Sequence, residues 1–138
     1  MKGISALRCR VLEANRDLLA RQQPPTDVED PLQRFLVGAH AFVAFATEDP
    51  VRYLLLFQRT GPGFTPIPAS MAVATQVLAQ PVTALSDFGV HDPTDVDLVL
   101  SGLVGLVGQQ NTNEPHGTRW TTLTDRMVTA LLREVGAA

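Results

Sequence analysis

Hydrophobic residues recur at intervals of three and four along most of the chain, a spacing typical of helices that bury one face. The first such segment places Ile4, Leu7, Val11 and Leu18 on one side of a helix. Stretches that contain proline or glycine separate it from the segments that follow. The pattern predicts six helices, at about Ile4–Gln22, Pro31–Glu48, Pro50–Arg59, Ser70–Phe88, Pro93–Asn111 and Thr118–Glu134.

No segment alternates apolar and polar residues in the way that half-buried strands do, so we expect no β-structure. The 138 residues fit one domain, and the composition of 45% hydrophobic and 18% charged residues is typical of globular proteins. We therefore expect a single all-α domain that covers residues 1–138.

Asp-Pro pairs stand at three of the expected helix starts. An aspartate before a helix can accept a hydrogen bond from a first-turn amide, and proline suits the first helical position because its missing N–H would have no partner there. We interpret each pair as a helix cap: Asp30-Pro31, Asp49-Pro50 and Asp92-Pro93.

Other helix boundaries are less regular. Pro81 lies inside the fourth helix and should kink or break it, and Thr118 is the expected cap of the last helix. The stretch from Thr60 to Ser70 contains two glycines and three prolines, which predicts an irregular surface loop. We expect Phe64 to anchor that loop.

The fifth helix carries glycines at positions 102, 105 and 108, each of which costs roughly 1 kcal/mol relative to alanine. Ser101, Gly105 and Gly108 fall on one stripe with Gly102 beside it, and small residues let another helix approach closely. Apolar residues occupy almost the whole remaining circumference, so this helix should be covered on all sides.

A second copy of the chain would provide that cover. We predict a homodimer in which the last two helices of each copy form a four-helix bundle. The alternative is that the fifth helix is the central helix of a monomeric bundle. The predicted interface residues are Leu98, Ser101, Gly102, Gly105, Gly108, Trp120, Leu123, Met127, Ala130 and Leu131.

The net charge, the single cysteine and the lengths of the apolar runs exclude several classes of protein. A net charge of −3 argues against a free-standing DNA-binding surface, which needs a basic patch. The single Cys9 excludes an internal disulfide and a cysteine zinc cluster. The longest apolar runs are far shorter than the roughly 18 residues of a membrane span, and charges throughout the N-terminal segment exclude a signal peptide. We expect a cytoplasmic protein with no membrane partner.

Three histidines raise the question of a metal site, as in the DinB-like helical-bundle enzymes that bind a metal through scattered histidines. His40, His91 and His116 form no i,i+4 pair and have no pattern of supporting carboxylates. Motifs for a catalytic triad or a phosphate-binding loop are also missing. We therefore expect no metal, no cofactor and no enzymatic activity; a metal-dependent enzyme of the DinB-like type is the alternative.

Three stretches resemble the C-terminal regulatory domain of tetracycline-repressor (TetR) family transcription regulators. They are "FVAFATEDPVRYLLLFQRTGPGFTP", "GLVGQQNTNEPHG" and "RWTTLTDRMVTALL", and the resemblance covers nearly all of the chain. The family places a DNA-binding helix-turn-helix before this domain, whereas only "MKGIS" precedes the first helix here. The resemblance implies a sensing and dimerising domain that contacts DNA only through the missing head. The chain is then either part of a longer regulator or a headless protein that pairs with a full-length one.

The resemblance also implies a mostly apolar pocket for a small apolar or aromatic effector, walled by the helices before the dimer pair. We expect it between the second, third and fourth helices, with the Pro81 kink opening space. The alternative for each aromatic candidate is an ordinary core position, and for His40 a satisfied buried or half-buried histidine. The candidate ligand-binding residues are His40, Phe42, Phe45, Tyr53, Phe57, Met71, Gln76 and Gln110.

Overall fold

The computed structural model describes residues 2–23, 27–57 and 68–137, and within them it contains helices and no strand. The all-α prediction is confirmed. No helix in these ranges is long and apolar enough to cross a lipid bilayer. The elements are α1 (Lys2–Arg21), α2 (Pro31–Glu48), α3 (Pro50–Phe57), α4 (Pro68–Asp87), α5 (Pro93–Asn113), the 3-10 turn η1 (Thr121–Leu123) and α6 (Thr124–Glu134).

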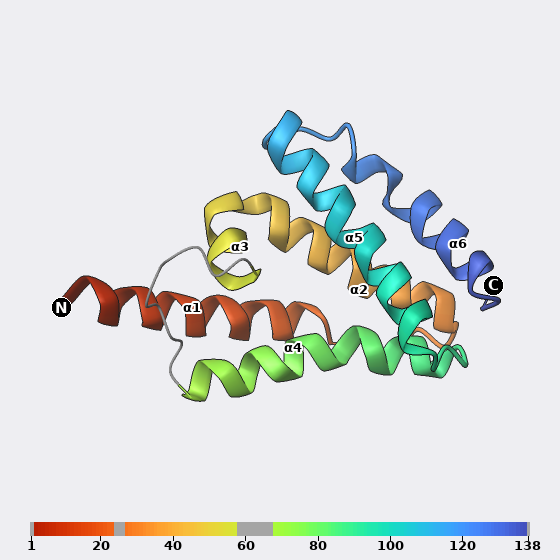
Figure 1. The fold of residues 1–138 in the computed structure, drawn as a ribbon, viewed down its shortest axis with the longest axis horizontal. Helices are drawn as coiled ribbons and strands as arrows, with labels where there is room; N and C mark the ends of the chain where they lie inside the picture. The colour runs from red at the N-terminus through yellow and green to blue at the C-terminus, as the bar shows by residue number, and fades with distance from the viewer. Residues whose placement is uncertain (1, 24–26, 58–67, 138) are drawn as a thin grey trace.

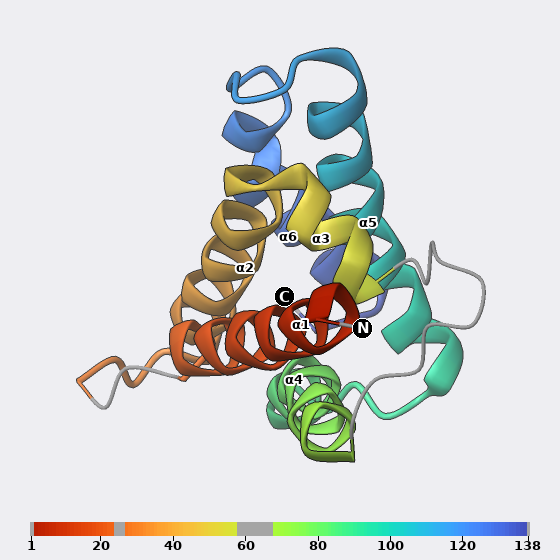
Figure 2. The same ribbon diagram turned by 90° about the vertical axis from the view of Figure 1, so that its left-hand side faces the viewer.

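Helix α2 lies at the centre of the arrangement and packs against each of the other five α-helices. Figure 1 shows α1 and α4 side by side below it, with α5 and α6 as an antiparallel pair above it. In Figure 2, seen from the end that holds the N-terminus, α3 lies between α2 and α5 and above α1. The chain thus forms layers of helices on opposite sides of α2.

The three Asp-Pro caps are confirmed. The side chain of Asp30 accepts a hydrogen bond from the Leu32 amide at 3.2 Å. Asp49 accepts from the Arg52 amide at 3.1 Å, and Asp92 accepts from Thr94 at 2.8 Å. The proline that follows each aspartate opens the helix, so local sequence alone fixes where α2, α3 and α5 begin.

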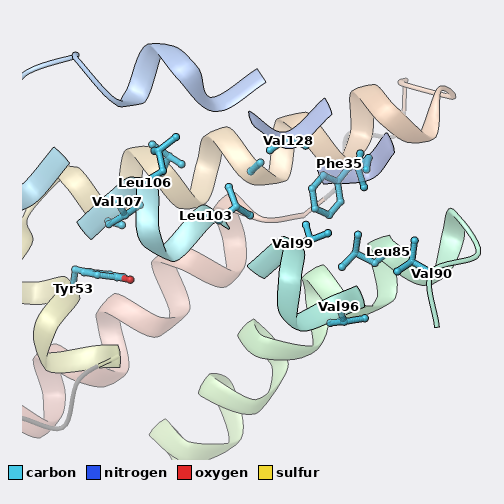
Figure 3. Close-up of a cluster of buried hydrophobic side chains, with 14 residues drawn as sticks. Phe35, Tyr53, Leu85, Val90, Val96, Val99, Leu103, Leu106, Val107 and Val128 are labelled. Carbon is cyan, nitrogen blue, oxygen red and sulfur yellow. The ribbon is translucent and has the colours of Figure 1, made fainter. Parts of the chain in front are cut away.

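The main core lies where α2, α4, α5 and α6 converge. In Figure 3, Phe35 of α2 lies near Leu85 of α4 and Val99 of α5, with Val128 of α6 behind them. Val99 and Val128 have no exposed surface. This convergence buries one face of α5 and joins the C-terminal pair to the rest of the fold.

A second cluster joins α1 to α2 and α3. Phe45 of α2 is fully buried, and two guanidinium groups cover its ring, with Arg52 Cζ at 3.9 Å and Arg21 Cζ at 5.6 Å from the ring centroid. Both arginines donate to Oε2 of Glu48, at 2.8 Å from Arg21 and 3.2 Å from Arg52. Hydrogen bonding from Arg21, and less strongly from Arg52, lowers the pKa of Glu48.

Two expectations about helix boundaries were wrong. Pro81 does not break α4, which continues to Asp87. Its packing along α1, α2 and α5 offsets the cost of about 3 kcal/mol that an internal proline carries. The last α-helix begins at Thr124, after a 3-10 turn, and not at Thr118. The Thr118 side chain is not its cap, because a glutamine from α5 binds the first amides of this segment.

Gly102 allows α5 and α6 to approach each other closely. A Cβ added there would collide with Leu131 Cδ1 and lie 3.6 Å from Met127 Sδ. We expect Gly102→Ala to be less stable than Gly38→Ala by about 1 kcal/mol, because the added methyl displaces Leu131. At Gly38, also inside a helix, a Cβ meets nothing within 4 Å, so alanine should stabilise by up to about 1 kcal/mol. Urea unfolding measures both. Equal gains at the two positions would contradict the close approach.

The Glu48 network predicts a pH-dependent contribution to stability. Glu48 is ionised and bound to two arginines in the folded state, so its pKa is lower there than in the unfolded chain. The contribution of Glu48 to the free energy of unfolding is therefore complete above the pKa that Glu48 has in the unfolded chain. It is lost as the pH falls through the lower pKa that Glu48 has in the folded state. Glu48→Gln should lower the free energy of unfolding at pH 7 by at most about 1 kcal/mol, because the side chain is 53% exposed and screened by water.

The difference between the variant and the wild type should begin to shrink near the ordinary glutamate pKa of about 4 and should vanish once the pH is below the lowered pKa of Glu48 in the folded state. The matched control is Glu29→Gln, at an exposed glutamate. Urea unfolding at several pH values measures the difference. A deficit in Glu48→Gln that persists undiminished at pH 3 would show that the carboxylate charge is not the source.

Candidate functional site

A cavity of about 500 Å³ lies between α2, α4 and α5, close to the end of α1. Its volume is within the range of small-molecule sites in proteins. The wall from α2 consists of Pro31, Arg34, Phe35, Gly38, Ala39 and Phe42. The remaining described residues around it are Gln22, Val77, Gln80, Pro81, Thr83, Ala84, Asp87, Leu100, Leu103 and Val104.

The residue pattern of α2 explains why space is left here. The lining positions of this helix recur every three or four residues and therefore form one stripe along it. Gly38 and Ala39 occupy the middle of the stripe, and a Cβ added to Gly38 would meet no atom within 4 Å. Ala84 lies on the opposite wall. Large side chains at the ends of the stripe hold the helices apart, while small ones in the middle leave the space unfilled.

The cavity walls are mostly apolar, and charges lie toward one end. Helices α2 and α4 run in opposite directions, so the start of α2 lies beside the end of α4 (Figure 1). Arg34, near the start of α2, and Asp87, the last residue of α4, therefore flank the same end. Gln22 adds a polar group from the end of α1, and its buried Oε1 accepts no hydrogen bond from any described residue. The arrangement suits a ligand with an apolar body and a polar end.

The cavity differs in position from the prediction. The expected third wall was the short helix that follows Asp49, but the third wall is α5, through Leu100, Leu103 and Val104. The reason is that α3 packs against α1 and α2, where Tyr53 is buried in the core and Arg52 covers Phe45. Pro81 does line the cavity, although it does not break α4.

The predicted aromatic ligand residues are divided between the cavity and the core. Phe42 lines the cavity, and its ring meets Tyr53 edge-on with centroids 6.1 Å apart. Tyr53 is only 4% exposed, and this burial raises the pKa of its hydroxyl. Phe45 lies beneath the two arginines instead of at the cavity. The side chains of Phe57 and Met71, and all of Phe64, are outside the described residues.

The predicted polar ligand residues lie elsewhere. His40 is exposed, and its Nε2 lies 2.5 Å from Oδ1 of Asp125, so this pair links α2 to α6. It is therefore not a fully buried histidine: its side chain is 52% exposed and is satisfied by Asp125. Gln76 is exposed on α4 and is not part of the cavity wall.

Gln110 has a structural role at the α5–α6 corner. Its side chain is fully buried, and Oε1 accepts hydrogen bonds from the amides of Trp120 at 2.8 Å and Thr121 at 3.1 Å. Its Nε2 donates to the carbonyl oxygen of Glu114. These bonds cap the segment that leads into α6. The sequence held a signal for this role, because position 110 continues the buried spacing of 103, 106 and 107.

The predicted dimer residues fall into two groups. Gly102, Met127 and Leu131 meet within the chain, where α5 packs on α6, and each is half-buried there. Trp120 is half-buried, with the Arg119 guanidinium 4.4 Å from its ring centroid. The others lie exposed on the outer surface of the α5–α6 pair: Leu98, Ser101, Gly105, Gly108, Leu123 and Ala130.

The outer face of α5 is the part of the helix that the fold leaves uncovered. A Cβ added to Gly105 or Gly108 would meet nothing within 4 Å. Leu98 and Val104 flank these glycines and are 41% and 48% exposed. The three glycines of α5 therefore differ, because only Gly102 is needed for packing inside the chain.

The histidines lie in three different elements. His40 is in α2, while His91 precedes α5 and His116 follows it, the latter with a positive φ of 63°. The His91 ring lies 3.4 Å from the Ser86 hydroxyl. Among the described residues, no group of three or more histidine, cysteine, aspartate or glutamate side chains is placed to hold a metal ion.

The corner bonds of Gln110 lead to a stability prediction. Gln110→Leu keeps the side-chain volume but leaves the Trp120 and Thr121 amides without their acceptor, which should cost about 1–3 kcal/mol. The matched control is Gln109→Leu, at the exposed neighbouring position, which should change stability little. Urea unfolding followed by the fluorescence of Trp120 measures both. A Gln110→Leu variant as stable as the control would show that the corner does not depend on these bonds.

Comparison of the chain with known protein families, with curated protein sequences and with solved structures gives no match. The function therefore has to be inferred from the chain's own residues. Two features support that inference: the cavity and the exposed face of α5, which adjoin each other along one helix and share Val104.

Proposed function

We propose that this chain is a small-molecule-binding regulatory domain that forms a homodimer through α5 and α6, as its resemblance to TetR-family regulators implies. The observation that carries the proposal is the 500 Å³ cavity, whose mostly apolar wall includes α5. Such a cavity is the ordinary form of a small-molecule site. The proposed effector is a small, largely apolar molecule.

Helix α5 connects the proposed site to the proposed interface. Leu103 and Val104 contribute to the cavity wall, while Ser101 and Gly105 lie on the outer face of the same helix. Because the helix is a rigid element, a ligand that moves one side of it also moves the other. An effector that binds two positions of α5 with different affinity would shift the equilibrium between them.

Helix α1 is a second element through which ligand binding in the cavity would affect other parts of a regulator. Gln22 lies directly after α1 and lines the cavity, while Arg21 holds the helix to Glu48 of α2. In the regulators that the chain resembles, a helix like α1 follows the DNA-binding head. We propose that this chain acts in the cytoplasm and affects DNA only through such a head, whether it is on the same polypeptide or on a full-length partner.

Two glycine-to-leucine substitutions test the proposed cavity and the proposed interface independently of each other. Gly38→Leu places a side chain into the cavity, and Gly105→Leu places one on the outer face of α5; neither Cβ meets an atom within 4 Å. Both changes remove a helix-interior glycine, so both should preserve the helix. Wild-type protein should be a dimer at micromolar concentration and should be stabilised by hits from a thermal-shift screen of apolar small molecules.

We expect Gly38→Leu to lose the ligand-induced shift and remain dimeric. Gly105→Leu should keep the shift and become monomeric, which light scattering would measure. A monomeric wild type would refute the dimer. Hits that stabilise Gly38→Leu as much as wild type would refute the cavity as the binding site. Metal-dependent stabilisation in the same screen would favour the metal-dependent enzyme instead.

A further inference from the structure

We propose that the cavity binds an amphiphilic carboxylate, with its hydrocarbon part between α2, α4 and α5 and its carboxylate at Arg34. This inference rests on the proposed ligand-binding function and adds the chemical class of the ligand. It follows from the charge distribution around the cavity and from the apolar character of the rest of the wall.

The apolar part of the wall fits a hydrocarbon. Phe42 and Val77 are two of the lining residues from α2 and α4, and Leu103 faces them from α5. Gly38 leaves open space at the middle of the stripe. Moving a hydrocarbon chain from water into such surroundings contributes about 0.8 kcal/mol for each buried CH₂ group. An apolar body therefore provides most of the binding energy, and the polar end provides the selectivity.

Arg34 is the cation at the polar end. Its guanidinium is exposed and forms no ion pair within 4.0 Å with any described residue. Asp30, one turn earlier, uses its carboxylate to cap α2 through the Leu32 amide. The methylene stem of an arginine can lie along an apolar wall while its planar fork binds both oxygens of a carboxylate. The cavity thus presents a cation that is not paired with any carboxylate in the part of the chain that the structure describes.

Asp87 flanks the same end, and its charge would favour a ligand cation instead. The balance of donors and acceptors nevertheless favours an anion. Arg34 carries five N–H donors, whereas the Thr83 hydroxyl and the Gln80 amide on the opposite wall can either donate or accept and therefore serve either kind of head group. Both Arg34 and Asp87 are exposed, so water and salt weaken both charges, but the longer side chain of Arg34 extends farther than the short one of Asp87, which is the last residue of α4.

Three ten-carbon probes that differ only in the head group test the inference: decanoate, decanol and decylammonium. Binding to the full chain is measured by titration calorimetry at low salt and below micelle formation. We expect decanoate to bind about tenfold more tightly than decanol, which corresponds to one charge-assisted contact. Arg34→Gln should remove this advantage and leave decanol unchanged. Asp87→Asn should strengthen decanoate binding, because it removes a repulsive charge.

The control Arg16→Gln, at an exposed arginine of α1, should change none of the three affinities. Gly38→Leu should abolish binding of all three probes, which separates the cavity from non-specific adsorption. Equal affinity for decanoate and decanol would overturn the carboxylate assignment and leave the proposed cavity function standing. Preference for decylammonium that disappears in Asp87→Asn would show that the site selects cations. If no probe binds, the inference fails, and the thermal-shift screen decides the proposed function separately.

Discussion

The fold depends on the burial of α2, because this helix contacts all the others. Two of its faces are filled by large side chains: Phe35 and Val43 belong to the main core, and Phe45 lies under two arginines. The part of α2 around Gly38 and Ala39 is different, because these small side chains do not fill the space between α2, α4 and α5. The cavity is therefore a direct result of how large and small residues alternate around one helix. Phe35 and Ala39 belong both to the core and to the cavity wall, so stability and binding space come from neighbouring, overlapping faces of the same helix.

The success of the sequence-based predictions depended on how local each signal was. An aspartate and the proline after it determine a helix start within one turn, so the starts of α2, α3 and α5 could be predicted. The start of α6 could not, because a 3-10 turn precedes it and the side chain that binds the first amides of that turn belongs to Gln110, ten residues before Trp120. The apolar spacing predicted the extent of α4, but whether Pro81 would break it depends on the neighbouring helices, which no local pattern reveals.

The candidate site was predicted only in part for the same reason. Its apolar character and the contributions of Phe42 and Pro81 follow from the sequence, but the identity of the third wall does not. Helical spacing shows which residues share a face, not which helix that face will meet. The glycines of α5 illustrate this limit. Gly102 meets α6, whereas a Cβ added to Gly105 would meet nothing within 4 Å, although the sequence placed both among the predicted interface residues, with Gly102 beside the stripe that contains Gly105.

The capping role of Gln110 determines how α5 and α6 can move. One buried side chain holds the far end of α5 to the start of the α6 segment, and the Gly102–Leu131 contact holds the two helices together nearer the cavity. Because the Gln110 hydrogen bonds and the Gly102–Leu131 contact hold α5 and α6 together at two places, the two helices tilt as one rigid unit. With 21 residues, α5 is about 30 Å long, so a tilt of about 4° would displace the far end by about 2 Å. Val104 lies about halfway along α5, so an adjustment of about 1 Å there would become a displacement of about 2 Å at the far end, which is enough to change how two molecules fit together.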